Sequence, residues 1–114
     1  MAARLPDPAG GVIALRAMAL ADVPAVAAIE QQSYPAPQAW SEGIFRDCLR
    51  VGYLCRVLEA DALLAGYGIL SIAAGEAHLL NVCASPAFRG RGLGRQMVEH
   101  FLDLADRYKA HTVY

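Results

Sequence analysis

The stretch Arg89-Gly90-Arg91-Gly92-Leu93-Gly94-Arg95 decides how this chain is interpreted. It follows an apolar run, 77–84, that favours a strand, and it opens the helix-patterned run 93–108. The first N–H groups of a helix have no partner within the helix, and the helix dipole adds partial positive charge there. Glycines let the backbone close around a phosphate, and arginines add charge-assisted donors. The stretch therefore predicts a main-chain site for a phosphorylated small molecule.

The composition favours one domain with a hydrophobic core. Apolar residues make up 56% of the 114 residues, which argues against disorder. The formal net charge of -1 disfavours a role in which bulk charge binds nucleic acid or a membrane surface. Residues 1–11 show no secretory signal, and no apolar run reaches the roughly 18 residues of a membrane span. We therefore expect a cytoplasmic protein.

Three cysteines, Cys48, Cys55 and Cys83, lie among apolar neighbours and have no metal-ligand spacing. A catalytic cysteine needs an activating base, and the sequence shows none near these positions. We interpret them as buried free thiols in a reducing compartment, and we expect no metal site.

The pattern of apolar residues predicts an α/β chain with the element order β-α-α-β-β-β-α-β. Residues 1–11 are expected to form a disordered tail, and residues 12–114 the N-terminal and central part of one domain. Ser41 is a suitable N-cap for the second helix. The expected helices are 21–32, 42–50 and 93–108, and the expected strands are 12–18, 53–59, 63–72, 76–84 and 111–114.

The glycine stretch has the form R-x-x-G-x-G, carried by Arg89, Gly92 and Gly94. It lacks the G-K-[ST] of a P-loop, and it follows a fourth strand rather than opening a Rossmann unit. This arrangement resembles motif A of the GNAT superfamily of acyl-CoA N-acetyltransferases, and the resemblance extends over 12–114. It implies the GNAT fold, with a mixed sheet that lacks the C-terminal strands and helix of that fold.

Within that superfamily, the chain most resembles the ribosomal-protein-alanine N-acetyltransferases. The most specific stretch is W-S-E-x-x-F at 40–45; the others are 22–24 with 29–30, 80–84, and the glycine stretch. The resemblance implies an enzyme that moves an acetyl group from acetyl-CoA to the α-amino group of a protein N-terminus, with a ribosomal protein as a candidate substrate.

The resemblance also implies how acetyl-CoA is held. A bulge in the strand 76–84 would splay it from the next strand and open the cofactor slot. A backbone N–H near Val82 would stabilise the oxyanion that develops on the thioester carbonyl. The implied cofactor contacts are Val82, Cys83, Ala84, Arg89, Gly90, Arg91, Gly92, Leu93, Gly94 and Arg95.

The groove for the acceptor is expected to be lined by Tyr34, Trp40, Glu42 and Asn81. For Trp40 and Glu42, a role in capping a helix and packing the core is equally open. Tyr34 lies in the proline-containing loop 33–39, which suits a substrate gate and a plain surface loop equally well.

The resemblance places the general base, a glutamate of the fifth strand, and the acid, a tyrosine of a later helix, beyond Tyr114. We therefore expect a C-terminally truncated domain that is inactive or impaired. His78 is the candidate substitute base, because period two places Glu76, His78, Leu80 and Val82 on one face of the strand. A strand residue without a catalytic role is the interpretation of His78 that we favour.

Two other functions stay open. The chain could be a GNAT enzyme that acts on a small amine or a lysine side chain, although the W-S-E-x-x-F stretch weighs against this. It could also be a non-catalytic CoA-binding or assembly module, completed as a homodimer through an exposed sheet edge.

Overall fold

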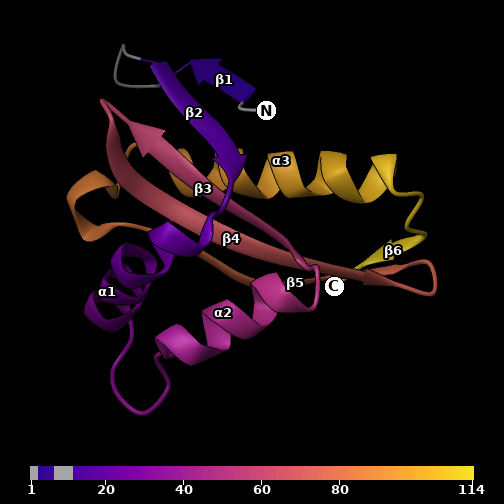
Figure 1. Cartoon of the computed structure of the whole chain (residues 1–114). Helices are drawn as coiled ribbons and strands as arrows, with labels where there is room; N and C mark the ends of the chain where they lie inside the picture. Colours follow the sequence, from indigo (N-terminus) through magenta and orange to yellow (C-terminus); the bar gives the residue numbers. More distant parts are fainter. Residues whose placement is uncertain (1–2, 7–11) are drawn as a thin grey trace.

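A six-stranded sheet in the order β1-β2-β3-β4-β5-β6 organises residues 3–6 and 12–114, the part of the chain that the computed structural model describes (Figure 1). Neighbouring strands are antiparallel except β5 and β6, which are parallel. The sheet is therefore mixed, as expected. Its strands are β1 (Ala3–Pro6), β2 (Val12–Ala17), β3 (Leu54–Ala60), β4 (Leu63–Ala73), β5 (Glu76–Ala84) and β6 (Thr112–Val113).

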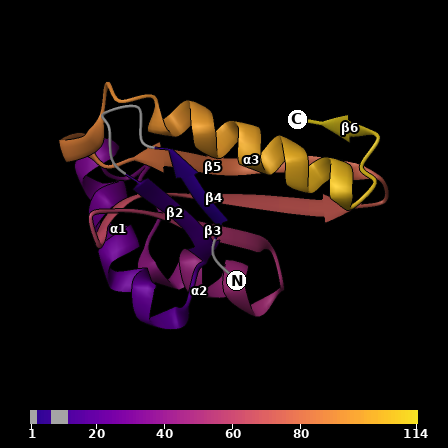
Figure 2. The same cartoon turned by 90° about the horizontal axis from the view of Figure 1, so that it is seen from above.

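The helices cover both faces of this sheet, as the view from above in Figure 2 shows. Helices α1 (Val23–Ser33) and α2 (Glu42–Arg50) pack on one face, and α3 (Leu93–Arg107) packs on the other. Short 3-10 turns, η1 (Leu20–Asp22) and η2 (Pro86–Phe88), precede α1 and α3. The predicted element order is confirmed for 12–114, with element ends shifted by one or two residues.

The prediction of a disordered tail is wrong for Ala3–Pro6. These residues form β1, which pairs with β2 from Ala3↔Leu15 to Pro6↔Val12. An edge strand tolerates a proline such as Pro6 because its outer N–H needs no partner. The rest of the predicted tail, 1–2 and 7–11, lies outside the described residues.

Two glycines of β4 set the distance between the sheet and α3. A Cβ added at Gly68 would lie 2.3 Å from Cε2 of Phe101, and one at Gly66 would lie 2.9 Å from Cε of Met97. Phe101 and Met97 are both buried side chains of α3. The glycines that weaken this strand locally therefore allow the helix to pack closely against it.

The three cysteines are buried and unbridged, which confirms the interpretation as free thiols. Burial raises the pKa of Cys55 to about 11 and also raises the pKa of Cys48. Among the described residues, no cluster of three or more His, Cys, Asp or Glu side chains could hold a metal ion. None of the described helices combines the length and apolar character needed to cross a membrane.

Candidate functional site

Strand β5 contains the predicted bulge, and it lies at Leu80. The pairing with β4 shifts between Ile69↔Asn81 and Leu70↔Leu79, which leaves Leu80 as the extra residue. Strand β6 pairs with β5 only before the bulge, and the contact nearest to the bulge is the Leu79 N–H donating to the Tyr114 carbonyl at 2.9 Å. Beyond Leu79, no other described strand lies beside this edge of β5.

The bulge overturns the prediction that His78 and Val82 share a face. Leu79, before the bulge, and Val82, after it, both pack against the cluster that α3 buries. Asn81 instead faces α1, where it donates to Glu30. One extra residue reverses the alternation of side chains along a strand, so His78 lies on the side opposite Val82.

In space, His78 lies beside Tyr114, the last described residue, and not beside the glycine stretch. Its Nε2 is 3.5 Å from Oε1 of Glu76, and its ring stacks on Tyr114 with centroids 4.8 Å apart. These contacts suit the favoured interpretation of His78 as a half-exposed strand residue without a catalytic role, and the alternative of a substitute base stays untested.

The glycine stretch forms a loop between β5 and α3, and a buried side chain anchors each end of this loop. Phe88 is 9% exposed and Leu93 is 1% exposed. Gly90 and Gly92 have φ angles of 79° and 75°, a left-handed conformation that favours glycine. Gly92 is the N-cap of α3, and the Gln96 N–H donates to its carbonyl at 3.2 Å. The N–H groups of 93–95 therefore have no partner within the helix and can receive an anion.

Three arginines surround this loop. The Arg91 guanidinium lies 5.0 Å from the centroid of the Phe88 ring. Nε of Arg89 donates to the Ala84 carbonyl at 3.4 Å, and Arg95 is an exposed residue of the first turn of α3. The loop thus combines main-chain donors with positive charge, which suits a pyrophosphate.

Glu30 is the residue that the sequence analysis missed. Its side chain is buried, with 2% exposure. Oε1 accepts hydrogen bonds from the Tyr67 hydroxyl at 2.5 Å and from Nδ2 of Asn81 at 2.9 Å, and Oε2 accepts one from the Trp40 N–H at 2.9 Å. Among the described residues, no cationic side chain pairs with it. Two signals in the sequence could have found it: its place in the family stretch 29–30, and a charge on the apolar face of a helix, where burial is costly without hydrogen bonds.

The Glu30 network borders a cavity of about 220 Å³ beside the β5 bulge. A second cavity, of about 270 Å³, shares Tyr34 and Trp40 with it. Burial raises the pKa of Tyr34, so its hydroxyl stays protonated at neutral pH. The structure thus brings three of the four expected acceptor residues together. The first cavity, called the Glu30 cavity below, is lined by Glu30, Tyr34, Gln38, Trp40, Leu80 and Asn81.

The structure does not bring Glu42 to this cavity. Glu42 lies in the first turn of α2 and forms an exposed ion pair with Arg46 at 3.3 Å. The Trp40 ring packs on Phe45, a core residue, with centroids 5.4 Å apart, and Ser41 caps α2. The W-S-E-x-x-F stretch therefore serves as a helix start and a core contact, with Trp40 also reaching the cavity.

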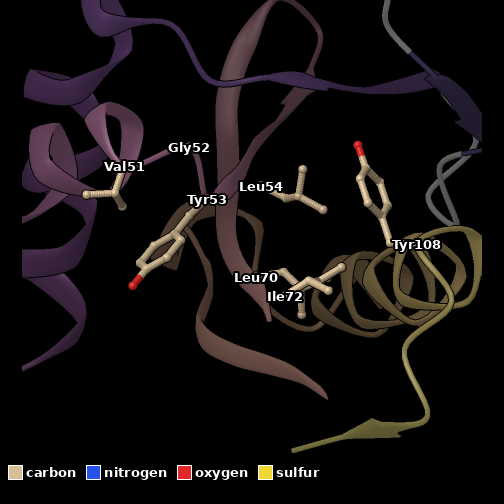
Figure 3. Close-up of a pocket in the computed structure, with 7 residues that line it drawn as sticks. All are labelled: Val51, Gly52, Tyr53, Leu54, Leu70, Ile72 and Tyr108. Carbon is tan, nitrogen blue, oxygen red and sulfur yellow. The ribbon is translucent and has the colours of Figure 1, made fainter. Parts of the chain in front are cut away.

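A further cavity, of about 210 Å³, lies between the turn after α2, the strands β3 and β4, and the end of α3 (Figure 3). Tyrosine hydroxyls are the only polar side-chain groups among its lining residues, which suits apolar contact rather than acid–base chemistry. The lining residues are Val51, Gly52, Tyr53, Leu54, Leu70, Ile72 and Tyr108.

The bulged strand, the glycine loop and the helix that follows define the class of protein. The family model described as Acetyltransferase (GNAT) family matches residues 16–114. The chain belongs to this family.

Its relatives include named ribosomal-protein acetyltransferases. The chain is 39% identical over 82 residues to the [ribosomal protein bS18]-alanine N-acetyltransferase of Salmonella typhimurium, covering 72% of this chain and 54% of that protein. It is 31% identical over 93 residues to the Escherichia coli protein of the same name, covering 82% and 62%. The crystal structure of the ribosomal-protein-S18-alanine N-acetyltransferase from Escherichia coli matches with a TM-score of 0.79 and 28% identity, over 89% of this chain and 64% of that chain. The chain thus spans between half and two thirds of these relatives.

Proposed function

We propose that this protein is an N-acetyltransferase that moves an acetyl group from acetyl-CoA to the α-amino group of a protein N-terminus. Family membership and the names of the relatives support this activity. The single observation that carries it is the bulge at Leu80. On one side of this bulge, Leu80 lines the Glu30 cavity. On the other side, the edge of β5, unpaired among the described strands, continues to the glycine loop.

The described residues fit acetyl-CoA. The N–H groups at the start of α3, with Arg89, Arg91 and Arg95 around them, suit the pyrophosphate. The edge of β5 at Val82–Ala84 suits the amides of the pantetheine arm, because the structure places no described strand against it. Acetyl-CoA, when bound, supplies the acetyl group as a thioester.

The reaction forms a C–N bond and breaks the C–S bond, and the electron pair leaves on the CoA sulfur. An α-amino group has a pKa of about 7.7–8.0, so a modest base suffices to give the neutral nucleophile. This chain would contribute mainly by holding both reactants, and by a backbone N–H near Val82 that stabilises the oxyanion. The family resemblance assigns the base and the acid to a glutamate and a tyrosine beyond Tyr114, and neither role is given to a described residue.

Mass spectrometry of peptides with free N-termini, incubated with acetyl-CoA and the full-length protein, tests this proposal. We expect an acetyl group on the α-amino group, with preference for peptides that begin with alanine, as the names of the relatives suggest. Acetylation of lysine side chains or small amines alone would favour the second enzyme hypothesis. Binding of acetyl-CoA without any acetyl transfer would favour the CoA-binding module.

The same proposal includes the partner and the location. A ribosomal protein is the proposed acceptor, as the names of the relatives suggest. The cytoplasm is the proposed compartment, because an enzyme would meet such an acceptor there. Assembly through the open edge of β5 is measurable by light scattering on the purified protein, and a strict monomer would exclude the homodimer.

A further inference from the structure

Glu30 fixes which way the Asn81 amide points. A carboxylate oxygen only accepts hydrogen bonds, so the group of Asn81 that faces Oε1 of Glu30 at 2.9 Å is the NH₂ group, Nδ2. The amide oxygen, Oδ1, therefore faces away from Glu30. Among the described residues, no donor is paired with Oδ1. The Asn81 side chain thus presents an unused acceptor beside the bulge residue Leu80.

The other two donors keep Glu30 an acceptor. Burial, together with the hydrogen bond to Glu30, raises the pKa of Tyr67 far above its usual range, so its hydroxyl remains a donor. The backbone N–H of Trp40 can only donate. Both groups converge with Asn81 on one buried carboxylate that has no cationic partner among the described residues. The network therefore holds the amide in one orientation, with the Glu30 carboxyl group beside the Glu30 cavity.

We propose that Glu30 is a positioning residue that turns Oδ1 of Asn81 toward the primary amine of the acceptor. An amine or ammonium N–H donates to this oxygen. The amine is thereby placed beside Leu80, at the bulge of β5. The inference deepens the proposed function and rests on it for the reaction, but the recognition requires only a primary amine.

Glutamine at position 30 would remove this constraint. Its amide can donate to Oδ1 of Asn81, so the Asn81 amide can rotate and present its NH₂ group to the cavity. Two donors would then face each other when an ammonium group enters. Glu30→Gln has nearly the same volume, and it therefore separates amide orientation from packing.

The test is calorimetric titration of the 114-residue chain with two tetrapeptide amides that begin with alanine, one with a free N-terminus and one N-acetylated. We expect the free amine to bind about tenfold tighter, the lower range for a hydrogen bond to a charged group. Glu30→Gln and Asn81→Ala should each remove this preference, and the double variant should lose no more than either single one. Asp47→Asn, which removes an exposed carboxylate of α2, should keep it.

Three results would overturn the inference: a preference retained in Glu30→Gln, equal loss of affinity for both peptides, or no preference in the original chain. If Glu30→Gln fails to fold by circular dichroism, Asn81→Ala decides alone in the same assay. The two proposals can fail separately. A preference without acetyl transfer to α-amino groups contradicts the proposed function only, whereas transfer with the preference intact in Glu30→Gln contradicts the role of Glu30 only.

Discussion

The glycine loop and the Glu30 cavity both adjoin β5, but they are built in opposite ways. The loop offers main-chain N–H groups and surrounding arginines, and its two glycines at positive φ set its shape. The cavity offers side chains, and a buried carboxylate with three hydrogen-bond donors sets their arrangement. The loop should therefore be disturbed by an added Cβ atom more than by the loss of a side-chain charge. The cavity should be disturbed more by the loss of its side-chain carboxyl group.

The largest loss of stability is expected for Glu30→Ala, which tests how the cavity is held together. The substitution leaves the Tyr67 hydroxyl, the Asn81 amide and the Trp40 N–H without their shared acceptor. We expect the free energy of unfolding to fall by about 3 kcal/mol or more, because each unsatisfied buried group costs about 1–3 kcal/mol. Urea unfolding followed by circular dichroism measures it. Asp47→Ala, at an exposed position, should change stability by less than about 0.5 kcal/mol. Equal effects of the two substitutions would contradict the structural role of Glu30.

A smaller loss of stability is expected for Gly68→Ala. This substitution tests how closely α3, the helix that follows the loop, packs against β4. The new Cβ would lie 2.3 Å from Phe101, so α3 would have to shift. Overpacking of this kind costs about 1–3 kcal/mol. The same denaturant titration gives the value, and Phe101→Leu in the Gly68→Ala background should restore part of the loss. If the double variant is no more stable than Gly68→Ala, close packing at this point is not the cause.

The contrast also explains what the sequence could and could not predict. The glycine loop is local: the spacing of Arg89, Gly92 and Gly94 after an apolar run suffices to predict its place between a strand and a helix. The Glu30 network is not local, because Tyr67 and Asn81 lie 37 and 51 residues away from Glu30 in the chain. Only the packing of α1 on the sheet brings them together.

The bulge shows a second limit on prediction. The resemblance implied a bulge in β5, but alternation alone could not show that Leu80 is the extra residue. His78 and Val82 were therefore placed on one face in error. Strand β1 shows a third limit, since the pairing that forms Ala3–Pro6 depends on β2 rather than on the composition of the segment itself.

At the glycine loop, Gly92→Ala and Arg95→Ala compare a main-chain with a side-chain contribution. Alanine at the Gly92 φ of 75° should cost about 1 kcal/mol, and we expect acetyl-CoA to bind about tenfold more weakly because the start of α3 is displaced. Arg95→Ala removes an exposed charge and its ion pair with Glu99, so its effect on acetyl-CoA binding should be a few-fold and should shrink as salt is added. Isothermal titration with acetyl-CoA at low and high ionic strength measures both. A larger loss for Arg95→Ala at both salt concentrations would mean that side chains, not the main chain, hold the cofactor.

The smallest loss of stability is expected at Asp22. Unlike Glu30, this carboxylate has a cationic partner among the described residues, Arg16. Nη1 and Nη2 of Arg16 each donate to Asp22 at 2.8 Å, and these bonds lower the pKa of Asp22. Because the pair is partly exposed, Asp22→Asn should cost less than about 1 kcal/mol at pH 7. A carboxyl whose pKa is lowered on folding stabilises the protein above its unfolded pKa, about 3.9, and this contribution disappears as the pH falls through the lower, folded value. Urea unfolding at several pH values should therefore show the two stability curves converging in acid. Curves that stay parallel down to acid pH would mean that Asp22 acts through its shape rather than its charge.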